Sequence, residues 1–535
     1  MNFGRRQNMN EHTRPAGKTK ILVVGLDGGN WTGLTPMLEA GIMPNLKSLI
    51  ERGSSGILES TIPPATAPAW SSFQTGKYPN RHGIIDFFMY QPWSYETEFT
   101  TSNHLKGNTL WKMLSDSGKR VIAVNLPMTY PPEKINGVII PGFDAPDTVS
   151  HSTHPEGILE TIEKKMGSYK HYRKGWNDQA FKAGGLENLI KELWVYTDTQ
   201  VEVVKFLMGD SDWDVCMYHF QAHDALQHYA WELIDQNAPP YKTKPENQKK
   251  LVKDFYKRLD EKVGELLVAA GPDAMVVVLS DHGFQTLYRS FHINNWLRDK
   301  GYLCESKTYF LTKIFDNVVG LGKRFRLPVL KNLKQPIRKN PMGNFRKINF
   351  KQSLAYAYSY RNNFSFLVFN NSMRDRVASL EADLLALADG DRKTVRAVYP
   401  WYDGSSDGRF KPDLVVEFEK GYGVIQKVTS RKKSPFQDKV DPGHHAFEGM
   451  FCVVGNNIKR GFTGRARLVD MMPTILHMVG NAIPDDLDGR VISEIFESYR
   501  QETYLQSDDH QSSRTERGKE DFDKVAARLE SLGYI

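Results

Sequence analysis

Short runs of apolar residues recur along the chain, and most of them end at glycine or at an acidic residue. The clearest run is AMVVVLSDHGF at 274–284, and ILVVGLDG at 21–28 has the same form. Unbroken apolar runs of this length are typical of strands buried on both faces of a parallel sheet. Four further runs predict strands: KRVIAVNLP at 119–127, GVIIPGFD at 137–144, WDVCMYHF at 213–220 and GMFCVVG at 449–455.

Apolar residues at helical spacing lie between these runs. MPNLKSLIERG at 43–53 ends in a glycine stop, and longer helical patterns cover 188–209 and 249–271. Strands that alternate with helices predict an α/β fold with a mostly parallel central sheet flanked by helices. The segment TIPPATAPAWSSFQTGKYPNRHGIIDF at 61–87 fits neither pattern, and we interpret it as a constrained turn around Thr66.

The alternating rhythm breaks between residues 300 and 430. A basic stretch punctuated by glycine and proline is followed there by strands of irregular spacing. We interpret 300–430 as an insertion or cap on a catalytic core formed by 20–299 and 431–495. We expect residues 1–19 to form a disordered tail. We expect residues 496–535 to form a polar tail that contains a short amphipathic helix.

Composition narrows the class of protein only slightly. The 535 residues are 40% hydrophobic and 25% charged, and 70 basic against 63 acidic residues give a net charge of +7. These values are ordinary for a globular protein and indicate neither nucleic acid nor a membrane as a partner. No apolar stretch of about 18 residues predicts a membrane span, and no apolar run follows the basic start as in a secretory signal. Three widely spaced cysteines favour a reducing compartment, so we expect a cytoplasmic location.

Acidic and imidazole side chains gather where the predicted strands end. In open α/β sheets ligands bind beyond the carboxyl ends of the strands, so separate segments can meet at one rim. Mixed Asp and His sets without cysteine suit zinc, and also manganese or iron. Taken singly, each of these Asp and His residues could instead have a structural role, in a helix cap, a turn or a surface ion pair. Four segments contribute: Asp27, Asp224 with His228, Asp281 with His282, and His444 with His445.

Taken together with the Thr66 segment, these motifs resemble the alkaline phosphatase superfamily. Within it, the chain is most similar to the type I phosphodiesterase/nucleotide pyrophosphatase family of the soluble prokaryotic type. The resemblance covers residues 20 to about 490 and implies an alkaline-phosphatase-like core. It rests on VVGLDG, MPNLKSLIERG, TAPAWSSFQTGKYPNRHGI, FQAHDALQH, LSDHGF, GHHAFEGMFCVVG and DMMPTILHMVGNAIPDDLDGR.

The resemblance implies two divalent metal ions, zinc or alternatively manganese. The family pattern places one ligand three residues before the Glu-Gly pair, which selects His445 over His444. Attack by Thr66 on phosphorus would give a phosphothreonine intermediate that water then hydrolyses. The expected substrate is a small phosphate ester, with nucleotides among the candidates, cleaved at a phosphodiester or pyrophosphate bond. The implied ligands are Asp27, Thr66, Asp281 and His282 for one ion, and Asp224, His228 and His445 for the other.

Several alternatives stay open. The same scaffold supports phosphomonoesterases, phosphonate hydrolases and phosphotransferases, and a non-catalytic binding protein is a further alternative. Animal-type members carry an Asn three residues after the nucleophile, where this chain has Ala69, so the contact to the phosphoryl oxygen must come from elsewhere, for example the Ala67 N–H. Ser71 and Ser72 are nearby hydroxyls that we interpret as helix-start residues, and we interpret His219 as a strand-end residue.

Overall fold

A computed structural model gives the fold of most of the chain. It describes residues 20–145, 152–167, 176–306, 345, 347–359, 362–401, 412–429, 434–438 and 441–506. The predicted tail at 1–19 and the predicted C-terminal helix lie outside the described residues. No helix within the described ranges is both long and apolar enough to cross a membrane.

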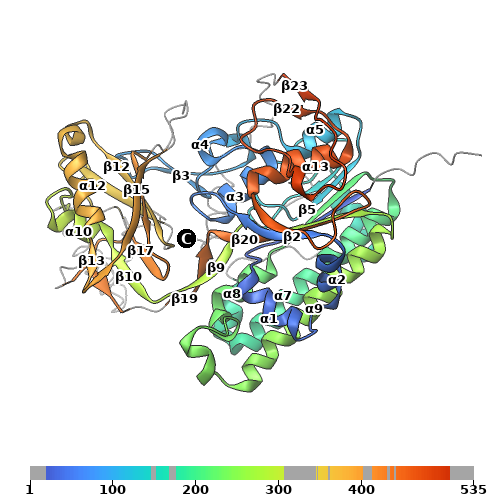
Figure 1. Cartoon of the computed structure of the whole chain (residues 1–535), viewed down its shortest axis with the longest axis horizontal. Coiled ribbons are helices and arrows are strands. Elements are labelled where there is room, and N and C mark those ends of the chain that lie inside the picture. The colour runs from blue at the N-terminus through green and yellow to red at the C-terminus, as the bar shows by residue number, and fades with distance from the viewer. Residues whose placement is uncertain are drawn as a thin grey trace, which may run out of the picture.

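An eight-stranded sheet forms the centre of the larger lobe (Figure 1). Strand β1 pairs in parallel with β7 and β8, and β7, β5 and β6 continue in parallel on one side. Strand β20 runs antiparallel to β8 and β2. The mostly parallel sheet expected from the sequence is confirmed. Its strands, in spatial order, are β21 (Thr463–Arg467), β2 (Ser54–Glu59), β20 (Glu448–Val454), β8 (Met275–Leu279), β1 (Ile21–Leu26), β7 (Val215–Phe220), β5 (Val121–Val124) and β6 (Gly137–Ile140).

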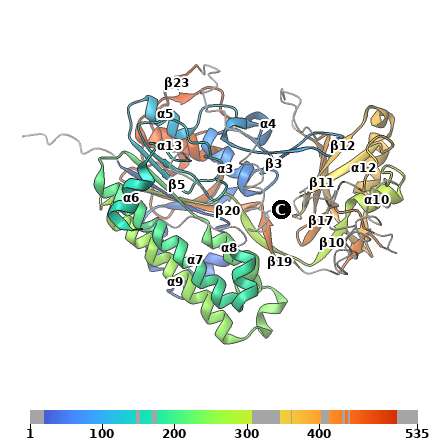
Figure 2. The same cartoon turned by 180° about the vertical axis from the view of Figure 1, so that it is seen from behind.

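Helices cover both faces of this sheet (Figures 1 and 2). Alternate residues of β1 point to opposite faces, so Leu22 and Val24 join one apolar core while Ile21 and Val23 join the other. One face packs against α1 (Trp31–Glu39), α2 (Pro44–Arg52), α7 (Trp176–Asp210), α8 (Ala222–Ala230) and α9 (Glu246–Ala270). The other packs against α3 (Thr66–Thr75), α5 (Leu110–Asp116) and α13 (Met471–Val479).

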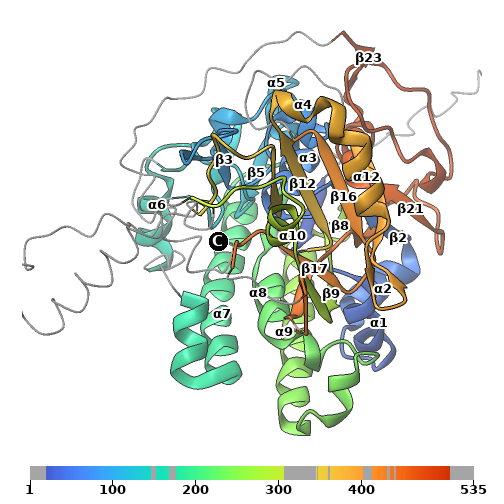
Figure 3. The same ribbon diagram turned by 90° about the vertical axis from the view of Figure 1, so that its left-hand side faces the viewer.

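A smaller lobe lies beside the central sheet, and Figure 3 shows it from its own side. Its core is an antiparallel sheet in the order β11 (Ala355–Ser359), β12 (Phe364–Phe369), β16 (Leu414–Phe418) and β15 (Val395–Pro400), with α10 (Ile293–Asp299) and α12 (Val377–Leu385) nearby. A second sheet joins β10 (Arg289–His292), β17 (Tyr422–Ile425) and β18 (Phe436–Gln437). The ribbon of β9 (Gly283–Leu287) and β19 (Asp441–Ala446) connects the two lobes (Figure 1).

Two sequence interpretations are wrong in detail. The segment interpreted as a constrained turn is largely helical, because Thr66 opens α3 and Pro79–His82 form α4. Every residue of α3 is buried, so packing against the sheet outweighs its weak helix propensity. Ser71 and Ser72 consequently lie inside α3 and do not start a helix. Strands β2 and β21 were not predicted at all.

Candidate metal centre

The fold brings the predicted site segments to one rim of the central sheet. Asp27 follows β1, and Asp281 and His282 follow β8, so these three residues lie at the carboxyl ends of adjacent parallel strands. Asp224 lies on α8, directly after the next strand, β7. His445 comes from the connecting ribbon, where β19 pairs it with Phe284 of β9. The parallel register therefore gathers groups that lie hundreds of residues apart.

The first predicted set surrounds the imidazole of His282. His282 Nε2 lies 3.5 Å from Asp27 Oδ1, 3.3 Å from Asp281 Oδ2 and 3.5 Å from Thr66 Oγ1. All four side chains are buried, with at most 1% of their surface exposed. Asp281 is held from behind, since its Oδ1 accepts a hydrogen bond of 3.1 Å from the Gly28 N–H.

The second predicted set is equally compact. Asp224 Oδ1 lies 3.5 Å from His228 Nε2 and 3.4 Å from His445 Nε2, and the two imidazole nitrogens are 3.0 Å apart. Asp224 and His228 occupy one face of α8 because they are four residues apart. The structure thus places three oxygen and nitrogen donors within reach of a single ion.

The two sets touch each other. The rings of His282 and His445 stack with centroids 3.7 Å apart and an interplanar angle of 20°. Ligand atoms of Asp27, Asp224 and His282, which come from both predicted sets, lie within 4.8 Å of one another. All seven predicted side chains therefore form one continuous cluster.

Each imidazole of the cluster turns Nε2 inward and Nδ1 toward the main chain. Nδ1 lies 3.1 Å from the Gly283 oxygen in His282, 3.3 Å from the Gly443 oxygen in His228 and 3.3 Å from the Pro64 oxygen in His445. A main-chain oxygen can only accept, so Nδ1 carries the proton and Nε2 presents a lone pair. Metal-binding histidines are oriented by the same kind of outer hydrogen bond.

Burial creates an electrostatic imbalance in the cluster. It raises the pKa of Asp27 well above its ordinary value, and the Asp281 and Asp224 carboxylates add to the rise. It also raises the pKa of Asp281 to about 7. Burial acts on Asp224 in the same direction, but the His228 and His445 imidazoles outweigh it and lower its pKa. Burial lowers the pKa of His282 well below its usual value. Three carboxylates accordingly share one site, and burial favours the uncharged form of two of them, Asp27 and Asp281.

Divalent cations fit this donor set. Asp27 Oδ1 and Asp281 Oδ2 are buried and have no hydrogen-bond partner among the described residues. The inward Nε2 atoms of His228 and His445 are 3.0 Å apart, a separation that needs either a proton on one ring or a cation between the two lone pairs. Leaving buried carboxylates uncompensated is costly, and a bound cation removes that cost.

A shell of residues that the sequence interpretation left aside supports Asp27 and its loop. His219 Nε2 lies 2.8 Å from Asp27 Oδ2, and His223 Nδ1 lies 2.8 Å from the Asp27 main-chain oxygen. Gln227 Nε2 donates to the Gly28 oxygen at 3.0 Å. One signal was present in the sequence: His223 and Gln227 share a face of α8, offset by one residue from Asp224 and His228.

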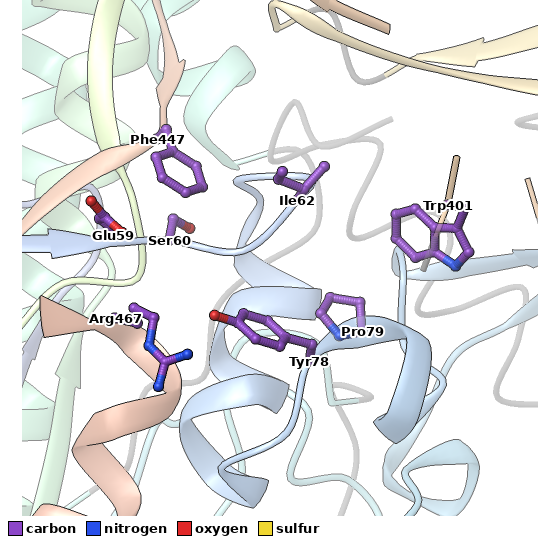
Figure 4. Close-up of a pocket in the computed structure, with 8 residues that line it drawn as sticks. All are labelled: Glu59, Ser60, Ile62, Tyr78, Pro79, Trp401, Phe447 and Arg467. Atoms are coloured by element: carbon purple, nitrogen blue, oxygen red, sulfur yellow. The ribbon is translucent and has the colours of Figure 1, made fainter. Parts of the chain in front are cut away.

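Two pockets lie next to the centre. A cleft of about 770 Å³ runs between the lobes, and Phe284 lines it while also contacting the His445 ring at a centroid distance of 5.4 Å. A smaller pocket of about 50 Å³ is shown in Figure 4, where the Tyr78 ring points toward Arg467 and Trp401 of the smaller lobe lies on the side of Pro79. Its wall includes Ser60, whose hydroxyl donates to the Asp281 main-chain oxygen. None of the seven cluster residues lines either pocket.

Solved structures share this architecture. Phosphonoacetate hydrolase from Sinorhizobium meliloti 1021, in complex with phosphonoformate, matches with a TM-score of 0.52 and 16% identity over 86% of this chain and 95% of that one. Its complex with phosphonoacetate gives a TM-score of 0.53, also at 16% identity, over the same shares of the two chains. Human ectonucleotide pyrophosphatase/phosphodiesterase 5 matches with a TM-score of 0.52 and 12% identity over 90% of this chain and 100% of that one. Identities this low establish the common fold alone.

Sequence comparison adds the family. No curated protein matches the chain significantly. The sequence profile of one family, type I phosphodiesterase / nucleotide pyrophosphatase, matches residues 21–445. That range begins at β1 and ends at His445, so it encloses all seven residues of the cluster. The chain therefore belongs to the type I phosphodiesterase / nucleotide pyrophosphatase family.

Proposed function

We propose that this protein is a hydrolase that binds two divalent cations and cleaves phosphodiester or pyrophosphate bonds. The observation that carries the proposal is the convergence of three buried carboxylates and three inward-facing imidazoles beside one hydroxyl. The cations would be held by Asp27, Thr66, Asp281 and His282, and by Asp224, His228 and His445. Zinc suits this mixture of oxygen and nitrogen donors, with manganese as the alternative.

Thr66 is the proposed nucleophile. Its hydroxyl is buried at the first position of α3, and Ala65 provides no side-chain cap there. Bound divalent cations would lower the pKa of this hydroxyl and neutralise charge on the phosphoryl group. Thr66 Oγ1 would attack phosphorus and displace the leaving group, and water would then hydrolyse the phosphothreonine.

The start of α3 also supplies groups that can bind the phosphoryl oxygens. The main-chain N–H groups of Thr66 and Ala67 lie in the first turn of α3 and have no acceptor within the helix, while Pro68 has no N–H. Uncapped N–H groups and the helix dipole favour a bound anion. Ala69 cannot replace the Asn of animal-type members, because its side chain is a buried methyl group in the core. The Ala67 N–H therefore takes that role in the proposal.

Phosphonate hydrolysis is the second candidate activity. It is favoured by one observation, the fold shared with a phosphonoacetate hydrolase over 86% of this chain. Both reactions need the same cations and nucleophile, and they differ in whether a P–O or a P–C bond breaks. The interlobe cleft and the smaller lobe, which includes strands of the predicted cap at 300–430, are the proposed source of this selectivity. A cytoplasmic location is proposed as well, in keeping with the three free thiols.

The decisive assay compares bis-p-nitrophenyl phosphate, p-nitrophenyl phosphate and phosphonoacetate as substrates. The diester should be cleaved fastest, and chelation should abolish turnover. Thr66→Ala should lower the rate by about 10³-fold or more. Thr75→Ala is the matched control, because Thr75 lies in the same buried helix and its hydroxyl contacts main-chain groups alone, donating to the Ser71 oxygen and accepting from the Lys77 N–H.

Other outcomes separate the alternatives. Full activity in Thr66→Ala would exclude Thr66 as the nucleophile. Faster release of phosphate from phosphonoacetate would select the phosphonate hydrolase. A protein that binds two cations but turns over none of the three substrates would be the non-catalytic binding protein.

A further inference from the structure

The imidazole of His219 lies buried beside the metal centre, at the end of β7. Its Nε2 is 2.8 Å from Asp27 Oδ2, and its Nδ1 is 3.0 Å from the Asn125 main-chain oxygen. The strand register sets this position, because His219 pairs with Gly25, two residues before Asp27. His219 is not among the seven candidate ligands, yet it contacts one of them directly.

Aromatic packing and a glycine on the neighbouring strand constrain the position of this ring. The Trp70 ring meets it edge to face, with centroids 4.7 Å apart and an interplanar angle of 78°. Gly25 makes room for both rings, because a Cβ atom there would lie 2.4 Å from the Trp70 ring and 3.4 Å from His219 Cδ2. Any larger residue at position 25 would push the indole against the imidazole.

Asn125 holds His219 at two points. Its main-chain oxygen faces the ring, and its Nδ2 donates to the His219 main-chain oxygen at 2.8 Å. Asn125 has φ +62°, a left-handed conformation that asparagine adopts more readily than most residues. Its Oδ1 accepts from the Tyr196 hydroxyl at 2.9 Å. The side-chain amide is therefore fixed from both ends, and it fixes the carbonyl that the ring contacts.

These contacts decide which oxygen Asp27 can offer. Asp27 Oδ2 is engaged by His219, whereas Oδ1 faces His282 Nε2 and has no hydrogen-bond partner among the described residues. A proton joins Asp27 to His219 whichever of the two atoms carries it, so Oδ2 is held away from the cluster in either case. We infer that His219 is a positioning residue that restricts Asp27 to one-oxygen ligation of a divalent cation. The inference rests on the proposed function.

Two variants of His219 separate positioning from packing. His219→Gln places its terminal amide near the position of ring Nε2, where it can donate through N–H or accept through its oxygen, so Asp27 Oδ2 keeps a partner. His219→Asn places its amide near ring Nδ1, which preserves a contact to Asn125 but leaves Asp27 Oδ2 without a partner. Both replace an aromatic ring by an amide, so both lose the edge-to-face contact with Trp70.

The test is calorimetric titration of Zn²⁺ into chelator-treated full-length protein. Asp281→Asn and His228→Ala assign the two binding steps. His219→Asn should weaken the step lost in Asp281→Asn by about 10- to 100-fold, the usual effect of removing an outer partner of a metal ligand. The other step should change by less than about threefold, and His219→Gln should retain near wild-type affinity at both.

Equal losses in the two His219 variants, equal losses at both binding steps, or no loss at all would each overturn the inference. If the wild-type protein binds no Zn²⁺, the proposed function fails first. If it binds two ions and His219→Asn behaves as His219→Gln, only the role of His219 fails.

A third variant, at Asn125, covers the case in which His219→Asn does not fold. Asn125→Gly leaves His219 and Asp27 intact, and glycine adopts φ +62° without strain. It removes the bond from Asn125 Nδ2 to the His219 main chain. Weaker Zn²⁺ binding at the Asp27-containing site alone supports positioning, and unchanged binding at that site contradicts it.

Discussion

Removal of the metal ions should make the stability of the folded protein fall as the pH rises. Burial raises the pKa of Asp281 to about 7, against an ordinary value of 3.8. Over that interval the folded state keeps a proton that the unfolded chain has lost, so the free energy of unfolding decreases with increasing pH. The loss amounts to about 4 kcal/mol in total, of which about 3 kcal/mol falls between pH 5 and pH 8. The raised pKa of Asp27 acts in the same direction.

Urea unfolding of chelated protein, followed by circular dichroism at several pH values, measures this slope. Asp281→Asn is the matched control, because the amide cannot ionise but its oxygen can still accept from the Gly28 N–H. Chelated wild type should lose about 3 kcal/mol more than chelated Asp281→Asn between pH 5 and pH 8. Zinc-loaded wild type should not show this loss. Identical slopes for chelated wild type and Asp281→Asn would refute the reasoning.

Three further substitutions test separate parts of the structure. Gly28→Ala should lower zinc affinity and thermal stability, because Gly28 has φ +66° and a Cβ atom would lie 2.7 Å from the Phe284 ring; unchanged zinc binding would contradict this. Burial lowers the pKa of His82 to about 3, so the unfolded chain takes up a proton between pH 7 and pH 5 that the folded protein does not. The free energy of unfolding of wild type, measured with urea, should therefore fall by about 2 kcal/mol more than that of His82→Gln over this range. Tyr358→Phe removes the bond from its hydroxyl to the Asp86 carboxylate and should cost about 1–3 kcal/mol in the same assay; no change would show that this link between the lobes is dispensable.

The strands of the parallel sheet were predictable because each is buried on both faces. Strand β8 shows no alternation of polar and apolar positions, because side chains on both of its faces are buried. Its continuous apolar run, which includes Val276, Val277 and Val278, therefore identifies it in the sequence. Strand β2 lacks that signal, because its sequence SSGILE contains two serines and a glycine. Gly56 is required there for a tertiary reason: a Cβ atom would lie 1.9 Å from the Gly464 oxygen of β21. That contact between strands is not visible in the sequence.

The site residues were suggested by motif order, but their geometry was not. The sequence places Asp27 and His219 192 residues apart, and only the pairing of β1 with β7 shows that they touch. The helix that begins at Thr66 was also hidden, because three prolines precede or enter it and its ten residues are stabilised by burial. Local sequence motifs therefore identified the Asp, His and Thr side chains of the cluster. The residues that support Asp27 could not be identified in this way, because their positions depend on strand register.

The central claim is that the seven clustered side chains bind two divalent cations beside the Thr66 hydroxyl. Anomalous X-ray diffraction from zinc-loaded crystals, recorded on both sides of the zinc absorption edge, tests it most directly. The account predicts two zinc peaks, one contacting Asp27, Asp281 and His282 and the other contacting Asp224, His228 and His445. A single peak, peaks elsewhere on the surface, or no peak among these residues in a fully loaded crystal would contradict it.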